Sequence, residues 1–340
     1  RADMQECFRV LLKELNSACT SMQVHLEMLD IDILRGGAEH DLLNGDLRAR
    51  LLKKIAEEVD MVIIAPPCDT YSRARHANFN GPQPLRDFTW QRGFPWLPPH
   101  LKERVERANV LIDFTADVLK TAMHSRVIAL LEFPEDLGRT THGVPASIWR
   151  WDAFQQLASY FTRGAIYQCD WAPVPYLKPT GLLTNCEAII NSPIFHKGWP
   201  LFDTTGRYSG PLPPRRPSGP GLIGRSPSGG FKTAPTAAYH PSMCLKLAAA
   251  LISDWQRQLS QDQPADTLAA GSTEQTPSIP AAAQPGGVSP NGRALASTPA
   301  APRSTRLESG GHPSLGQASS LQSHGQVPAS SAVAATSRMN

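Results

Sequence analysis

A single cysteine at the end of an apolar run has the clearest chemical potential in this chain. Residues 61–65 read Met-Val-Ile-Ile-Ala, which is typical of a buried β-strand, and Pro66 and Pro67 separate this run from Cys68. The prolines fix the backbone and delay entry into a helix. Cys68 is therefore expected in the crevice beyond the carboxyl end of the strand, where open α/β sheets bind ligands. A thiol placed there is a candidate nucleophile.

The alternative role for Cys68 is packing, because free cysteine is among the residue types most often buried. Its neighbours favour chemistry, since Asp69 makes the surroundings polar and Arg73 and Arg75 make them cationic. Cationic neighbours are expected to favour the thiolate. The two arginines are also candidate contacts for a substrate, with a solvated loop face as an equally favoured alternative.

A carboxylate follows the next expected strand. Residues 127–131 form a second apolar run that ends at Glu132, so this side chain is expected at the same sheet edge as Cys68. Its alternative role is a charge near the start of a helix expected over residues 147–160. The loop up to Pro145 makes that role less attractive, and we assign Glu132 a candidate catalytic role.

The elements that would position these residues alternate between strand and helix. Such βαβ rhythm predicts an α/β fold with a mainly parallel sheet. Residues 76–99, rich in proline, glycine and aromatic residues, are expected to form a long loop beside the active site. The remaining expected elements are helices over 3–15, 46–58, 99–124 and 241–259, and strands over 23–33 and 164–169.

Composition divides the 340 residues into three expected parts. Residues 1–162 are predicted to form the α/β core, and residues 163–255 a small substrate-recognition region with a closing helix. Residues 256–340 are dominated by Ala, Ser, Pro, Gly and Gln, which predicts a disordered, low-complexity tail.

The six cysteines have no paired spacing, so neither a disulfide framework nor a metal site is predicted. We find neither a stretch as long and apolar as a membrane span nor a signal peptide. The expectation is a soluble, intracellular protein without a metal or membrane partner, nuclear if the source is eukaryotic.

An acidic strand end, then Pro66-Pro67-Cys68, then Glu132-Phe133-Pro134, is an order that resembles the cytosine-5 DNA methyltransferases. The resemblance covers residues 1–184 and continues weakly to 255. It implies a Rossmann-like methyltransferase fold that uses S-adenosylmethionine to methylate C5 of cytosine in DNA. Cys68 would attack C6 of a flipped-out cytosine, and Glu132 would hydrogen-bond or protonate N3.

The resemblance also implies a cofactor site. Asp30 or Asp32, at the end of the first strand, would accept hydrogen bonds from the ribose hydroxyls, and Asp41 would lie near the adenine amine. Pro66 is assigned to the same site. Arg73 and Arg75 would anchor phosphates or the base.

The family pattern is incomplete in three places. The Gly-rich first strand would lie before Arg1, so we expect the chain to lack part of its original start and to bind cofactor poorly. Phe133 stands where the family has asparagine. The family's arginine motif is not visible around residues 167–170, and nearby Arg163 is the candidate that remains for substrate binding.

Two other functions can be weighed. Methylation of an amino group uses Asp/Asn-Pro-Pro-aromatic, which Ala65 and Cys68 do not match at either end. A catalytically degenerate remnant, at most a nucleic-acid-binding protein, stays open as the alternative. The net charge of +3 supports a nucleic-acid partner only weakly, and the residues fit DNA or RNA, with DNA favoured by the resemblance.

Overall fold

The structure, a computed structural model, describes residues 4–18, 25–77, 81–215, 239–262 and 331–338, with isolated positions between 222 and 236. These residues all belong to one compact unit that comprises residues 1–263 and 326–340. Its helices and strands are α1 Met4–Ala18, β1 His25–Ile31, α2 Ile33–Gly36, α3 Gly45–Glu58, β2 Met61–Ala65, α4 Pro99–His124, β3 Ile128–Pro134, α5 Asp152–Gln155, β4 Thr162–Tyr167, α6 Gln168–Trp171, β5 Pro179–Thr184, α7 Glu187–Ile190, β6 His196–Lys197, β7 Leu201–Phe202, β8 Tyr208–Gly210, α8 Pro241–Asp262 and β9 Ser331–Arg338.

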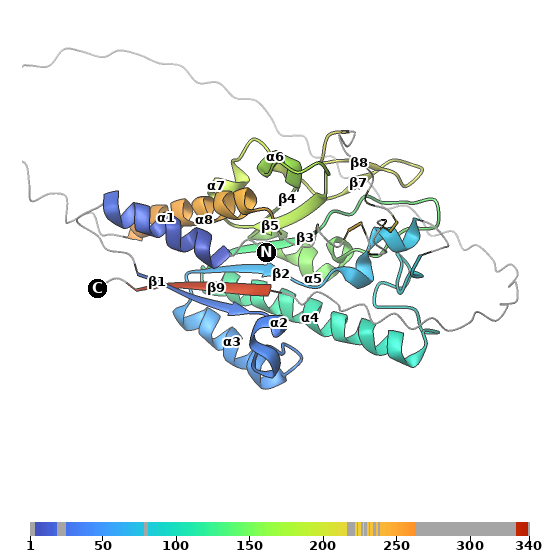
Figure 1. The fold of residues 1–340 in the computed structure, drawn as a ribbon, viewed down its shortest axis with the longest axis horizontal. Helices are drawn as coiled ribbons and strands as arrows, with labels where there is room; N and C mark the ends of the chain where they lie inside the picture. Colours follow the sequence, from blue (N-terminus) through green and yellow to red (C-terminus); the bar gives the residue numbers. More distant parts are fainter. Residues whose placement is uncertain are drawn as a thin grey trace, which may run out of the picture. The chain divides into compact units, whose positions relative to one another are not determined.

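The central sheet has seven strands in the order β1-β9-β2-β3-β5-β4-β6, and β7 pairs with β8 in a separate small sheet (Figure 1). The sheet is mixed. Strands β1, β2, β3 and β4 run in one direction, while β5, β6 and β9 run against them. The predicted α/β class is confirmed, and the expected common direction holds for these four strands. Among hydrogen-bonded neighbours, however, only β2 and β3 are parallel.

Both faces of the sheet are covered by helices. Val62 and Ile64 of β2 pack into a core with α3 and α4, whereas Met61 and Ile63 face a second core that includes α1 and α8. This division follows from the period of two in a strand. Figure 1 shows α3 and α4 on one side of the sheet and α1 beside α8 on the other. The continuous apolar run that predicted β2 is thus explained by burial on both faces.

Local sequence signals set the bounds of several elements. Strand β2 and helix α4 span the predicted residues, and Pro99 occupies the first turn of α4, where a missing N–H is tolerated. Helix α3 begins after Asn44, whose side chain accepts hydrogen bonds from the next turn, and it buries Leu47, Leu51 and Ile55 at helical spacing.

Two expectations for the region after α4 are wrong. Strand β3 continues to Pro134 instead of ending at Leu131, because β5 provides a partner strand as far as Pro134. The helix expected over residues 147–160 is broken into three short turns. The break lies at Trp151, whose backbone is extended, and the preceding Trp149 is buried and donates its indole N–H to the Pro134 carbonyl at 2.8 Å.

The predicted boundaries between the three parts also differ from the structure. The boundary between residues 162 and 163 falls inside β4, which is hydrogen-bonded to β5 in the same sheet. The expected tail begins with residues 256–262 still in α8, and residues 331–338 form β9. The rest of that tail, 263–330 and 339–340, lies outside the described residues.

None of the helices in the described part of the chain combines the length and apolar character that crossing a membrane requires.

Candidate functional site

The site is centred on Cys68, at the carboxyl edge of the central sheet. After β2 ends at Ala65, the two prolines lead to Cys68, which precedes a single turn of 3₁₀ helix, Asp69–Tyr71. The carbonyl of Cys68 accepts a hydrogen bond from the Tyr71 N–H at 3.0 Å. The residue keeps solvent-exposed surface. The position expected from the Pro-Pro-Cys sequence is therefore the one observed.

Glu132 lies on the adjacent strand at the same edge. Residues 61–64 of β2 pair in parallel with residues 128–131 of β3, which places Glu132 one step beyond the last pair. Its charge acts directly on the Cys68 thiol, so the two side chains share one site. Glu132 belongs to β3 and pairs with Leu182 of β5, and does not lie in the loop that follows.

Tyr239 joins this pair although no sequence pattern pointed to it. Its hydroxyl donates a hydrogen bond of 2.8 Å to Oε2 of Glu132. Burial, and then the charge of Glu132, raise the pKa of Tyr239 well above its usual range, so the tyrosine keeps the proton that it donates. Tyr239 immediately precedes the first turns of α8, and its distance of 107 residues from Glu132 hides the contact from sequence inspection.

Lys178 is the second residue that sequence reasoning missed. It lies just before β5, its ammonium donates to the Thr236 carbonyl at 2.6 Å, and it sits 5.5 Å from the centre of the Tyr239 ring. Its charge acts to lower the pKa of Cys68. The backbone of Lys178 has φ of 40°, which non-glycine residues seldom adopt. Such strain often marks positions held for function, and the unusual φ was not visible in the sequence.

The expectation that cationic neighbours favour the thiolate is wrong. Loss of hydration in the surrounding protein, and then the charge of Glu132, raise the pKa of the Cys68 thiol to about 12. Lys178 opposes this shift, but Asp69 adds to it. The resting residue is therefore a protonated thiol at neutral pH.

Arg73 and Arg75 are directed to the backbone of neighbouring loops. Arg73 donates to the carbonyls of Gly138 and Arg139, the latter at 2.9 Å, and Arg75 donates to the carbonyls of Asp69 and Gln83 at 3.1 and 3.0 Å. Burial is the main cause that lowers the pKa of both guanidinium groups. These contacts brace the loops around Cys68, a role that neither sequence interpretation had assigned to them.

Arg163 is enclosed in the protein. Its side chain and that of Glu135 are both fully buried and form an ion pair, and a second N–H group donates to the Gly198 carbonyl at 2.7 Å. The guanidinium also stacks over Trp149 at 4.8 Å. A guanidinium enclosed in this way, with both terminal nitrogens paired inside the protein, has a structural role, and Arg163 is not included among the substrate contacts.

The acidic residues assigned to the cofactor gather around the end of β1. Asp30 pairs with Arg35 at 2.5 Å, and Asp32 caps α2 by accepting from the Leu34 N–H at 2.9 Å. Asp41 accepts from the N–H of Leu43 at 3.0 Å. Asp30 and Asp32 thus lie at the end of β1, and all three carboxylates have a local structural contact.

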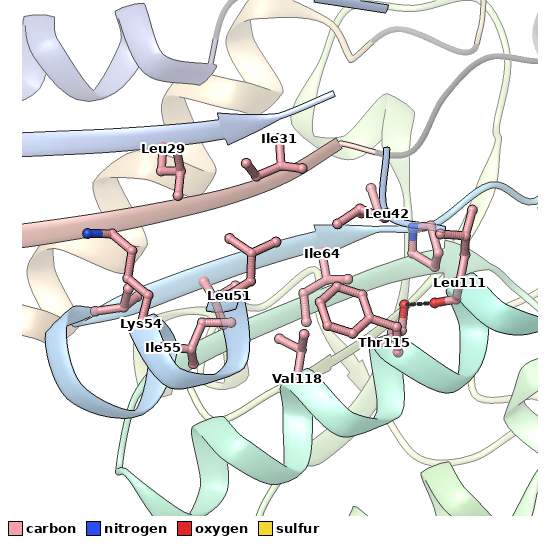
Figure 2. A pocket seen from close by; sticks show the side chains of 15 residues that line it. Leu29, Ile31, Leu42, Leu51, Lys54, Ile55, Ile64, Leu111, Thr115 and Val118 are labelled. Atoms are coloured by element: carbon pink, nitrogen blue, oxygen red, sulfur yellow. Dashed lines mark hydrogen bonds between the residues drawn. The ribbon is translucent and has the colours of Figure 1, made fainter. Parts of the chain in front are cut away.

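Pro66 lines an apolar crevice between the sheet and helices α3 and α4, shown in Figure 2. Its walls include Ile31 of β1, Ile64 of β2, Leu51 of α3 and Val118 of α4. Lys54 and Thr115 are the polar side chains in the lining, and the Thr115 hydroxyl is satisfied by the Leu111 carbonyl at 2.9 Å. The crevice encloses about 40 Å³, which is room for roughly three water molecules, and most of its lining residues belong to the core between the sheet and these helices.

The residues around this strand end fit only part of S-adenosylmethionine. Carboxylates at the end of β1 match ribose hydroxyls, whereas the crevice of about 40 Å³ beside Pro66 is too small for an adenine ring. The described residues provide no glycine-rich turn for the methionine half, and β9 occupies the position between β1 and β2.

Metal chemistry finds no support in the described residues, where no group of three or more His, Cys, Asp or Glu side chains could hold an ion.

Comparison with known proteins adds no relative to this picture. No protein-family model matches the chain. No curated protein and no solved structure matches it either.

Proposed function

We propose that this chain is an S-adenosylmethionine-dependent methyltransferase with a Rossmann-like fold that methylates C5 of cytosine in DNA through a covalent adduct on Cys68. One observation carries the proposal: a cysteine that keeps some solvent-exposed surface follows two prolines at a sheet edge, beside a carboxylate on the neighbouring parallel strand that the hydroxyl of the partly buried Tyr239 orients. A nucleophile and an acid partner in one site are what attack on a pyrimidine ring requires.

In the proposed reaction, the Cys68 thiol loses its proton to solvent and the sulfur forms a bond to C6 of the cytosine. The electron pair of the C5–C6 double bond moves to C5, which then accepts a methyl group. S-adenosylmethionine supplies that methyl group when it is bound. Loss of the C5 proton restores the double bond and breaks the sulfur–carbon bond, which returns the cysteine.

Glu132 is proposed to carry a proton on Oε1 and to donate it to N3, as a hydrogen bond or by transfer, and so to reduce the negative charge that the ring gains during attack. Tyr239 holds Oε2 of the carboxylate, which leaves Oε1 for the base. Lys178 favours the thiolate at the moment of attack, because its charge lowers the pKa of Cys68. The raised resting pKa keeps the thiol protonated until a substrate reaches the site.

The cofactor is proposed to lie at the end of β1, next to Pro66. Asp30 or Asp32 would accept from the ribose hydroxyls, and Asp41 would lie near the adenine amine. The local contacts of these carboxylates set their orientation at the strand end.

The test is covalent trapping. The chain is incubated with S-adenosylmethionine and DNA that contains 5-fluorocytosine, and the mixture is resolved under denaturing conditions. Fluorine at C5 cannot leave as a proton does, so a methylated adduct persists on the enzyme. We expect an adduct that requires the cofactor and is absent from Cys68→Ser.

The Tyr239→Phe variant tests the arrangement of the site. It removes the hydrogen bond to Glu132 but keeps the ring beside Lys178, and we expect adduct formation to slow roughly tenfold, since a hydrogen bond to a charged group contributes about 1.5–3 kcal/mol. Circular dichroism should show the variant fully folded at the assay temperature, although loss of the hydrogen bond lowers its Tm.

Two outcomes of the trapping experiment would count against the proposal. An adduct on RNA alone would move the substrate from DNA to RNA. If neither nucleic acid gives an adduct while cofactor binding is measurable by calorimetry, the methylation reaction is rejected and the alternative of a non-catalytic nucleic-acid-binding protein takes its place.

A further inference from the structure

The loop of residues 81–98 exposes large aromatic rings beside the candidate site. Trp96 is 67% exposed, Phe88 53% and Trp90 42%. Tryptophan is usually well buried, and contiguous apolar surface on a soluble domain commonly marks an interaction site. Three exposed aromatic rings on one loop indicate a surface that binds a partner.

The rings already form a partial stack. Phe94 and Trp96 lie nearly parallel, with centroids 5.0 Å apart and an angle of 13° between the ring planes. Trp90 meets Trp96 edge-on, with centroids 5.7 Å apart. Because Phe94 covers one face of the indole and two-thirds of Trp96 remains exposed, a further planar ring has room to extend the stack.

The loop is fixed to the body of the protein. Arg86 is almost completely buried, lies 4.1 Å from the centre of the Tyr71 ring, and donates to the Gln91 carbonyl and to Asn109 of α4, each at 2.9 Å. Arg92 forms two hydrogen bonds with Asp113 of α4. A preorganised surface loses little conformational entropy on binding.

The same loop is joined to the residues that surround Cys68. Arg75 bridges the Asp69 carbonyl, next to Cys68, and the Gln83 carbonyl in the loop. The cations near the loop are paired with carboxylates, Arg92 with Asp113, Lys102 with Glu106 and Arg104 with Asp69. Arg150 also lies over the exposed Phe88 ring at 4.7 Å.

We propose that Trp90, Phe94 and Trp96 form a stacking platform for unpaired bases of a nucleic-acid strand that passes the candidate site. Bases suit this surface because each has a planar π-face that can stack on an exposed aromatic ring, and such stacking needs no particular base sequence. The platform depends on the proposed function only in taking a nucleic acid as its partner, because stacking needs no reaction at Cys68.

The experiment measures binding of the full chain to fluorescein-labelled (dT)20 by anisotropy, beside a strand of equal length and charge made of abasic residues. We expect Trp96→Ala to weaken binding of (dT)20 roughly tenfold and Trp96→Phe to restore most of it. Both variants should bind the abasic strand as the unchanged chain does. The matched control is Tyr160→Ala, which removes an exposed aromatic ring elsewhere and should have no effect.

Several results would overturn the platform. Unchanged binding of (dT)20 by Trp96→Ala would do so, and so would an equal loss on the abasic strand, which would show a purely electrostatic effect. Two further results would point to a different partner. The chain could bind phosphatidylcholine vesicles, or it could self-associate in ultracentrifugation. If Trp96→Ala abolished either property while (dT)20 binding stayed intact, the nucleic acid would be replaced as the partner.

The two proposals fail separately. If Cys68→Ser still binds (dT)20 in a Trp96-dependent way while trapping fails with every substrate, the methylation proposal is lost and the platform stands. If trapping succeeds and Trp96→Ala binds (dT)20 as the unchanged chain does, the platform is lost and the methylation proposal stands.

Discussion

At the scale of single residues, the chemistry of this site depends on groups that come from distant parts of the chain. Cys68 and Glu132 could be named from the sequence because each follows an apolar run. The raised pKa of Cys68 could not be inferred from the sequence. It arises from desolvation and from surrounding charges, including that of Lys178, which lies more than a hundred residues beyond Cys68. Arg73 and Arg75, by contrast, donate hydrogen bonds to backbone carbonyls.

The charge of Glu132 should be measurable at Cys68. Glu132→Gln removes a negative charge that raises the pKa of the thiol, so the thiolate fraction at pH 9 should increase. We expect alkylation of Cys68 by iodoacetamide at pH 9 to accelerate roughly three- to tenfold, since one pKa unit corresponds to a tenfold change. Mass spectrometry of the Cys68 peptide gives the rate.

In the unchanged chain the alkylation rate should continue to climb between pH 8 and pH 11, because a thiol with a pKa of about 12 is still gaining thiolate there. Glu57→Gln, an exposed change on α3, is the control and should follow the unchanged chain. A plateau near pH 9 in the unchanged chain would contradict the raised pKa.

At the scale of elements, agreement between sequence and structure is best where the signal is local. Helix α4 has the predicted bounds because Pro99 and the apolar spacing mark them within the element itself. The helix expected over residues 147–160 is interrupted at Trp151, whose backbone is extended, and a tertiary hydrogen bond from the Trp149 indole to Pro134 lies beside this interruption.

Strand β9 is the element furthest from any sequence expectation. Residues 331–338 lie in a segment of small and polar residues, but they pair antiparallel with β1 on one side and β2 on the other. The strand conformation of these residues is therefore set more by pairing with the two neighbouring strands than by the β-propensity of the residues themselves.

Ala334→Pro tests whether the sheet requires β9. Ala334 pairs with Leu29 of β1 and Val62 of β2, and proline in a strand paired on both sides removes a ladder hydrogen bond. We expect the free energy of unfolding in urea to fall by about 1–3 kcal/mol, the cost of leaving the partner carbonyl without its donor. Ala334→Val, which keeps the N–H group, should be nearly neutral, and equal stability of the two variants would show that the sheet does not need this strand.

At the scale of the whole molecule, a buried polar cluster connects the sheet to the segments around it. Glu135 follows β3, Arg163 belongs to β4, and the Tyr208 hydroxyl of β8 donates to Glu135 at 2.9 Å. Burial outweighs the charge of Arg163 and raises the pKa of Glu135. Each charge in the pair is tolerated only because the other is present.

Arg163→Met should therefore be strongly destabilising. It leaves Glu135 buried without its cation, and breaking such a pair costs about 3–5 kcal/mol. Asp113→Asn is the control, since it breaks the exposed pair with Arg92 and should cost about 1 kcal/mol or less. Urea unfolding at pH 8 compares the two.

The pH dependence of Arg163→Met has a definite sign. Glu135 in the variant has a folded-state pKa above its unfolded value, so the folded state binds the proton more readily. The destabilisation should be largest at pH 8 and should shrink as the pH falls toward 5. A loss that grows on acidification would contradict the assignment.

The sequence by itself determined the α/β class, the bounds of β2 and α4, and the placement of Cys68 and Glu132 at one sheet edge. These follow from local periodicity and from the rule that parallel strands present their carboxyl ends together. Only the tertiary structure decided the protonation of Cys68, the contacts of Tyr239 and Lys178, the burial of Arg163 and the strand contributed by residues 331–338. Each of these depends on groups far apart in the chain, where desolvation and pairing arise only once the segments meet.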